Sequence, residues 1–181
     1  MQVATHLFAR WGYTATTTAA IAEAAGITEP ILYRHFKTKQ ELFVAITRDM
    51  SKQTIEHWKH LIEGSAGPVE QIRHIAREFP DHLKRLGDAY QVLHGALSAS
   101  RERKVVSVLR EHYAEIERFF VSIITTGQQS GDFRRDLDPK VPAWLLINLG
   151  IGYAMIALNL NQRDHFSIEQ AVEFILRGLK S

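Results

Sequence analysis

The 181-residue chain contains no cysteine. This absence excludes disulfide frameworks, thiol nucleophiles and zinc sites with cysteine ligands, and it is compatible with a reducing cytoplasm. An excess of one charge is also missing, because 22 Lys and Arg side chains stand against 20 Asp and Glu side chains. Bulk charge therefore does not indicate a nucleic-acid partner, and any such function has to rest on local geometry. The first residues, MQVATHLFARWG, lack the basic and apolar regions of a signal peptide.

Motifs for catalysis and metal binding are missing as well. The sequence has no nucleophile–base arrangement, phosphate-binding loop or paired-carboxylate motif, so we expect no enzymatic activity and no cofactor. Among its nine histidines, His57 and His60 could share a helix face. No Glu-x-x-His or His-x-x-x-His partner accompanies them, and we expect no metal site. A soluble helical enzyme stays open as an alternative.

Strand signals are scarce, and apolar residues recur mostly at helical spacing. The sequence therefore predicts an all-α fold of about nine helices. Their expected extents are 3–11, closed by Gly12; 17–24, capped by Thr16; 29–35, capped by Thr28; a helix from the Thr38–Glu41 capping box to about 62; 69–86, with a kink or break at Pro80; 88–99; 101–129; 140–160; and 167–180.

One apolar stretch is long enough to span a membrane. Residues 141–160, VPAWLLINLGIGYAMIALNL, carry no charge over 20 positions. Pro142, Asn148, Asn159 and two glycines lower its hydrophobicity, which favours a helix buried in a protein core or a subunit interface. We therefore expect no membrane association, and a one-span membrane protein stays as the other alternative.

Residues 17–35 combine two short helices joined by Ala25-Gly26-Ile27. A supporting helix, a turn with Gly and a second helix form a helix-turn-helix, whose second helix fits the DNA major groove. Ile21, Ile27, Leu32 and Phe36 can fill the small core beneath. The same arrangement also occurs in proteins that bind no DNA, so the spacing alone leaves both possibilities open.

The polar residues of the second helix suit contacts with DNA. Thr28 stands at a helix N-terminus, where a hydroxyl and free N–H groups suit a phosphate. Tyr33 and His35 can donate to phosphate oxygens, and Arg34 can contact a guanine edge or neutralise a phosphate. Lys39 opens the next helix and is a candidate phosphate contact.

Three further residues of this helix carry a different chemistry. Glu29 can accept a hydrogen bond from cytosine N4, although its charge repels phosphate. Pro30 and Ile31 can pack on a thymine methyl group. Of the residues in this helix, Glu29 and Arg34 are the ones expected to set the protein's own operator preference.

The stretch FARWGYTATTTAAIAEAAGITEPILYRHFKTKQELF resembles the DNA-binding domain of the TetR family of bacterial transcriptional regulators. The later loop SGDFRRDLDP is similar to the loop that often precedes the family's dimerisation helices. The residues that carry the main resemblance are Phe8, Gly12, Tyr13, Thr16, Thr17, Ile21, Ala22, Ala25, Gly26, Leu32, Tyr33, His35, Phe36, Lys39 and Leu42.

The resemblance implies a cytoplasmic homodimer that binds a palindromic double-stranded DNA operator, usually as a repressor, and is released by a small-molecule effector. It places the DNA-binding domain at 1–46, and a larger helical domain for ligand binding and dimerisation at 47–181. The expected DNA-binding residues are Thr17, Thr28, Glu29, Pro30, Ile31, Tyr33, Arg34, His35 and Lys39.

The larger domain holds the remaining candidates. The helices near 140–160 and 167–180 are expected to form the homodimer interface, partly because a helix that is apolar on every side needs cover on every side. Polar or aromatic residues at otherwise apolar positions are candidates for the effector site. They are Phe79, His82, Tyr90, His94, Tyr113, Phe120, Trp144 and Asn148.

Overall fold

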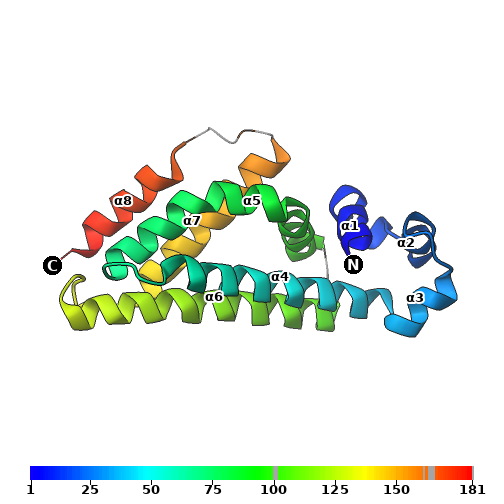
Figure 1. The fold of residues 1–181 in the computed structure, drawn as a ribbon, viewed down its shortest axis with the longest axis horizontal. Helices are drawn as coiled ribbons and strands as arrows, with labels where there is room; N and C mark the ends of the chain where they lie inside the picture. The colour runs from blue at the N-terminus through cyan, green and yellow to red at the C-terminus, as the bar shows by residue number, and fades with distance from the viewer. Residues whose placement is uncertain (100–101, 161, 163–165, 181) are drawn as a thin grey trace. The chain divides into compact units, whose positions relative to one another are not determined.

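The computed structural model describes residues 1–99, 102–160, 162 and 166–180. Within these residues the chain forms eight α-helices and no strand (Figure 1), which confirms the all-α prediction. The helices are α1 (Gln2–Ala15), α2 (Thr18–Ala24), α3 (Glu29–His35), α4 (Lys39–Ile62), α5 (Pro68–Ala99), α6 (Arg103–Ser130), α7 (Lys140–Asn159) and α8 (Ile168–Leu179). The start that we expected for α6, at 101, lies outside the described residues.

The described helices number one fewer than expected because the segments 69–86 and 88–99 belong to one element, α5. Pro80 lies inside this helix, and the interruption occurs at Leu86, where φ is −112° and ψ is 19°. A break at Pro80 is therefore wrong, whereas the interruption at Leu86 falls where the sequence separated the helix at 69–86 from the one at 88–99. Proline removes one backbone hydrogen bond, but Ala76, Phe79 and Leu83 are buried around it, and this packing keeps the segment helical.

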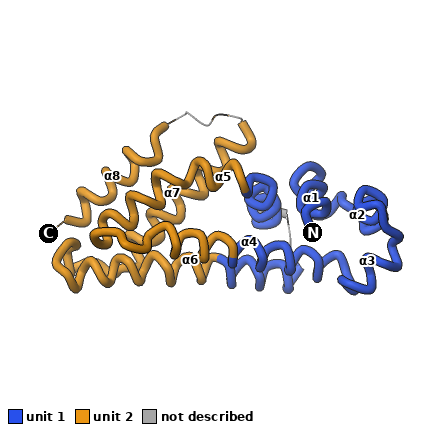
Figure 2. Tube along the Cα trace, in the orientation of Figure 1, with its two compact units in different colours: residues 1–52, 86–112 blue, residues 53–85, 113–181 orange. Residues whose placement is uncertain are grey.

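The chain divides into two compact units (Figure 2). The first contains Met1–Lys52 and Leu86–His112, and the second contains Gln53–Arg85 and Tyr113–Ser181. The helices α4, α5 and α6 each contribute residues to both units. Each unit has buried apolar side chains of its own, such as Phe43 in the first and Leu176 in the second.

Three aromatic rings organise the core of the first unit. Phe8 and Tyr13 from α1 pack against Phe43 from α4, with ring centroids 5.1 to 6.2 Å apart. Gly12 has a φ of 80°, which interrupts α1 between the first two rings. Thr38 caps α4 as predicted, because its hydroxyl accepts from the Glu41 N–H at 3.1 Å. The Glu41 carboxylate accepts from the N–H of Lys37 at 2.9 Å, one residue before the Thr38 N–H that a capping box would use. These features fix the start of α4 next to the small N-terminal helices.

In the second unit, α7 and α8 pack against each other. Ser167 caps α8 by accepting from the Gln170 N–H at 3.2 Å. The loop before α7 is held by Phe133, which is 1% exposed and packs on Gly127 of α6. A Cβ atom added to Gly127 would lie 2.1 Å from Phe133 Cδ2, so this position has no room for a side chain.

Among the described residues, α7 is the one helix long and apolar enough to cross a membrane. Ala143, Ile147 and Ala154 are nevertheless buried by the rest of the unit. On another face, Val141, Leu145 and Met155 are 47 to 53% exposed. The helix thus has one face in the core of a helical bundle and one apolar face at the surface.

Candidate functional site

Two short helices, α2 and α3, form the predicted helix-turn-helix. Thr17 caps α2 by accepting from the Ala20 N–H at 3.1 Å. The prediction that Thr16 would be this cap is wrong by one position. Thr16 is fully buried, and its hydroxyl donates to the Gly12 carbonyl at 2.8 Å, so it closes the end of α1. Thr17 is left exposed at the N-terminus of α2.

The turn between the helices is fixed by Gly26, whose φ is 67°. The next N–H, that of Ile27, donates to the Ala22 carbonyl at 3.0 Å and satisfies the end of α2. Leu32, 6% exposed, anchors α3 in the core, and Ile21, 2% exposed, anchors α2. The two anchors turn the opposite side of α3 towards solvent.

The residues expected to contact DNA lie on this outer side. Thr17, Thr28, Pro30, Tyr33, Arg34 and His35 are exposed, and Glu29, Ile31 and Lys39 are partly buried. Thr28 stands at the N-cap position of α3, but its side chain makes no capping hydrogen bond. Arg34 and His35 also stand in the last turn of α3, where a cation is favoured by the helix dipole. The arrangement can offer hydroxyl, guanidinium and imidazole groups to a groove.

A chain of hydrogen bonds links α2 to α3. The Thr18 hydroxyl lies 2.5 Å from Glu29 Oε1 and 3.1 Å from the Tyr33 hydroxyl. An ionised carboxylate can only accept, so Thr18 donates to Glu29, and Tyr33 therefore donates to Thr18. The Glu29 carboxylate is thereby held in one orientation, and the predicted contact of Tyr33 with a phosphate requires its hydroxyl to turn away from Thr18 when DNA binds. Sequence reasoning missed Thr18, because its role depends on the crossing of the two helices.

Lys39 makes contacts that the sequence did not indicate. Its Nζ donates to the carbonyl oxygens of Tyr13, Thr14 and Thr16 at 2.8, 3.2 and 2.9 Å. Its ammonium also lies 4.7 Å from the centroid of the Tyr13 ring. These three acceptors match the three protons of the ammonium group. Lys39 thereby joins the end of α1 to the start of α4 and brings a positive charge to the edge of the helix-turn-helix.

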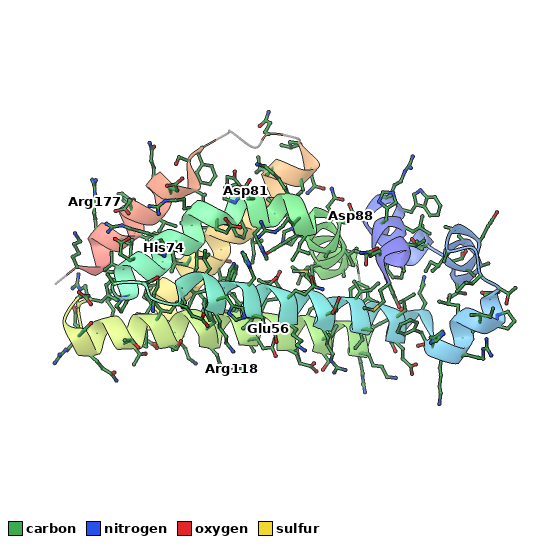
Figure 3. The ribbon with its side chains drawn as sticks, viewed as in Figure 1. Glu56, His74, Asp81, Asp88, Arg118 and Arg177 are labelled. Carbon is green, nitrogen blue, oxygen red and sulfur yellow. The ribbon has the colours of Figure 1, made fainter. Side chains whose placement is uncertain are left out.

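Two contacts connect the N-terminal helices with the other parts of the first unit. Glu102, which precedes α6, accepts from the Tyr13 hydroxyl at 2.9 Å and from Gln40 Nε2 at 2.6 Å. Burial, and then the nearby Glu102 carboxylate, raise the pKa of Tyr13 well above its usual range. His6 Nδ1 lies 3.0 Å from a carboxylate oxygen of Asp88. Asp88 belongs to α5 (Figure 3). The helices that flank the helix-turn-helix, α1 and α4, are thus linked to the segment before α6, and α1 is also linked to α5.

The residues expected to line an effector site fall into two groups. Tyr90 and His94 belong to the first unit, with ring centroids 6.0 Å apart, and burial lowers the pKa of His94. In the second unit Phe79, His82 and Phe120 are buried. Tyr113 is only partly buried, yet burial raises its pKa to about 12.

The last two candidates lie on α7. Trp144 is partly buried, and its Nε1 donates to Glu117 Oε2 at 2.9 Å. Asn148 is exposed at the surface of α7. The eight candidates are therefore divided between the two units, and the buried members are the ones that can line an interior site.

The structure adds Trp58 to the interior residues. This side chain is 4% exposed, and its ring lies 6.0 Å from that of His82, 5.7 Å from Phe119 and 5.6 Å from Phe120. Apolar spacing along α4 beyond Ile46 was the signal that could have found it. Within the described residues, no group of three His, Asp or Glu side chains could hold a metal ion.

Comparison with known proteins agrees with this geometry. Residues 1–46 match the family model described as "Bacterial regulatory proteins, tetR family". The chain is 28% identical over 141 residues to the HTH-type transcriptional repressor KstR2 of Mycolicibacterium smegmatis, a match that covers 76% of this chain and 67% of KstR2.

Solved structures share the fold over nearly the whole chain. The fatty acid degradation regulator FadR from Bacillus halodurans aligns with a TM-score of 0.81 and 13% identity, over 97% of this chain and 89% of that one. The regulator FadR from Bacillus subtilis, in complex with stearoyl-CoA, aligns with a TM-score of 0.79 and 18% identity, over 99% and 95%. Residues 1–46, which contain the helix-turn-helix, thus match the TetR family of bacterial regulatory proteins, and over most of its length the chain is similar to repressors and regulators of that kind.

Proposed function

We propose that this chain is a ligand-responsive transcriptional repressor. It binds a palindromic operator as a homodimer, and a small molecule bound among its C-terminal helices releases the DNA. Residues 1–46 form the DNA-binding domain, and residues 47–181 provide the effector site and the subunit interface.

The observation that carries the proposal is the exposed face of α3. Leu32 anchors the helix in the core, and Tyr33, Arg34 and His35 are exposed to solvent. A helix presented in this way can enter a major groove, where Arg34 contacts a base edge or a phosphate and the other side chains fix the register. Thr17 and Thr28, at two helix N-termini, complete the phosphate contacts, and Lys39 contributes its charge.

The exposed apolar face of α7 supports a homodimer. Val141, Leu145, Asn148, Gly152, Met155 and Asn159 are all exposed, recur at helical spacing and carry no charge. On α8, the packing partner of α7, Phe174 is 80% exposed. A second copy of this chain is the occupant that fits, because a palindromic operator requires two recognition helices related by two-fold symmetry.

An effector with a long apolar part is consistent with the shared fold. The regulator from Bacillus subtilis holds stearoyl-CoA on the same fold. The buried candidates here, Phe79, His82 and Phe120 among them, are mostly aromatic. Such walls suit a ligand with an apolar body and few polar groups.

DNA binding can be tested with the DNA that flanks this protein's own gene. We expect binding that weakens steeply as salt is raised, because phosphate contacts release counterions. Arg34→Ala should change the preferred sequence if Arg34 contacts a base, whereas Tyr33→Phe should weaken binding similarly for all sequences. Absence of any salt-dependent binding would contradict the proposal.

The subunit interface can be tested by sedimentation of the wild type and of Phe174→Glu. We expect a dimer for the wild type and a shift to monomer for the variant, because the new carboxylate would be buried in the interface. Arg110→Gln on α6 is a matched control, since it makes the same change in net charge at an exposed position. An equal shift in both variants, or a monomeric wild type, would refute the interface.

A further inference from the structure

The indole of Trp58 is a buried hydrogen-bond donor in the second unit. The residue is 4% exposed, and its Nε1 atom has no hydrogen-bond partner among the described residues. Phe119 and Phe120 of α6 stand beside its ring. A buried donor without an acceptor is costly, so a buried polar atom of this kind requires an explanation.

His82 adds a second polar side chain next to Trp58. It is 2% exposed, and its Nε2 lies 3.3 Å from the Thr54 hydroxyl. Burial, and then the charges of His57 and Arg85, lower the pKa of His82 to about 4. The imidazole is therefore neutral at physiological pH.

The charged groups that act on His82 lie at the edge of this cluster and are paired. Arg85 Nη2 donates to Glu78 Oε1 at 2.8 Å, and His57 Nε2 lies 3.4 Å from the same oxygen. The His57 ring stacks on that of His82, with ring centroids 5.1 Å apart. The interior side, formed by Trp58 and the phenylalanines, is aromatic and uncharged.

We propose that Trp58 Nε1 is the hydrogen-bond donor of the effector site, and that the effector is an uncharged, mainly apolar molecule with a carbonyl oxygen. An indole N–H can only donate, so its partner must be an acceptor. A carbonyl oxygen brings no proton that would need an acceptor of its own. A charged group would lose its hydration among these rings without an opposite charge to compensate. The inference rests on the proposed ligand-responsive function and names the chemistry of that site.

Three probes of similar length test this chemistry on the intact chain. Methyl octanoate carries the carbonyl group, nonane lacks it, and octanoate replaces it with a charge. We expect methyl octanoate to bind most tightly and to shift the Trp58 indole N–H signal in a nitrogen–proton NMR spectrum. Trp58→Phe should weaken methyl octanoate binding about tenfold while nonane binding stays the same. Trp11→Phe is the matched control, because the Trp11 side chain is 50% exposed on α1 and lies outside the proposed site.

The outcomes separate this site from the proposed function. Equal binding of nonane and methyl octanoate, preference for octanoate, or an indole signal that does not move would overturn the inference. The signal is measured on the wild type, so the result does not depend on whether Trp58→Phe folds. If methyl octanoate binds at Trp58 but the operator is not released, the site stands and the ligand-responsive function fails. If the operator is bound and none of the probes binds, the site fails and the DNA-binding function stands.

Discussion

Acidification should destabilise this protein through His82. The side chain is 2% exposed, and its pKa falls from 6.5 to about 4 on folding. As pH falls below the unfolded value, the unfolded chain takes up a proton that the folded chain does not. The unfolded state then binds more protons, so the free energy of unfolding decreases between about pH 6.5 and about pH 4.

The size of this effect follows from the two pKa values. Between about pH 7 and about pH 5, proton linkage at His82 alone removes about 2 kcal/mol from the free energy of unfolding. Urea unfolding followed by circular dichroism at the two pH values measures it. His82→Gln can keep a hydrogen bond to Thr54 but cannot titrate, so the variant should lose about 2 kcal/mol less than the wild type over this interval.

Leu83→Val is the control for a general loss of packing at this place. Leu83 is 3% exposed and does not titrate, so its substitution should lower stability at both pH values by a similar amount. The reasoning is refuted if His82→Gln and the wild type lose the same stability between the two pH values. That result would mean that His82 is protonated in the folded protein at the lower pH.

Three further predictions concern other parts of the structure. Lys39→Met should lower the free energy of unfolding by about 2 kcal/mol, because three carbonyl oxygens lose a charged donor. Urea unfolding measures this change, and an unchanged urea midpoint would show that water replaces the ammonium. Thr18→Val should reduce discrimination between operator variants, because Glu29 loses the hydrogen bond that orients its carboxylate. Competition binding with operators that carry single-base substitutions measures this, and an unchanged ranking of their affinities would contradict it. Gly127→Ala should cost about 1–3 kcal/mol, because the new Cβ meets the Phe133 ring, and Phe133→Leu should recover part of that loss.

Much of the fold could be predicted because its signals are local. The turn at Gly26 and the caps at Thr38 and Ser167 each occupy a few residues and are present as expected. Local signals gave the wrong prediction where tertiary packing decides which of several neighbouring residues is the cap, or whether a helix continues through a proline. Three threonines stand in a row at 16–18, and burial of the first makes the second the cap. At Pro80, packing on both sides kept a helix that the proline alone would have interrupted.

The candidate site was predictable to a smaller extent. The exposed positions of α3 follow from the helical repeat once Leu32 is buried. The hydroxyl of Thr18, the three acceptors of Lys39 and the buried indole of Trp58 depend on contacts between helices that are distant in the chain or differ in orientation. Helical spacing shows which side of a helix is buried, but it does not show which polar atoms meet inside the bundle.

Selection of bound sequences from a random pool of double-stranded DNA tests the central claim most directly. If α3 enters the major groove as part of a symmetric dimer, the selected sequences will share an inverted repeat. Its half-site centres will be about ten base pairs apart or a multiple of that distance. Repeating the selection with Arg34→Ala should change bases within each half-site and leave the spacing unaltered. No enriched sequence, or a single motif without two-fold symmetry, would contradict the account.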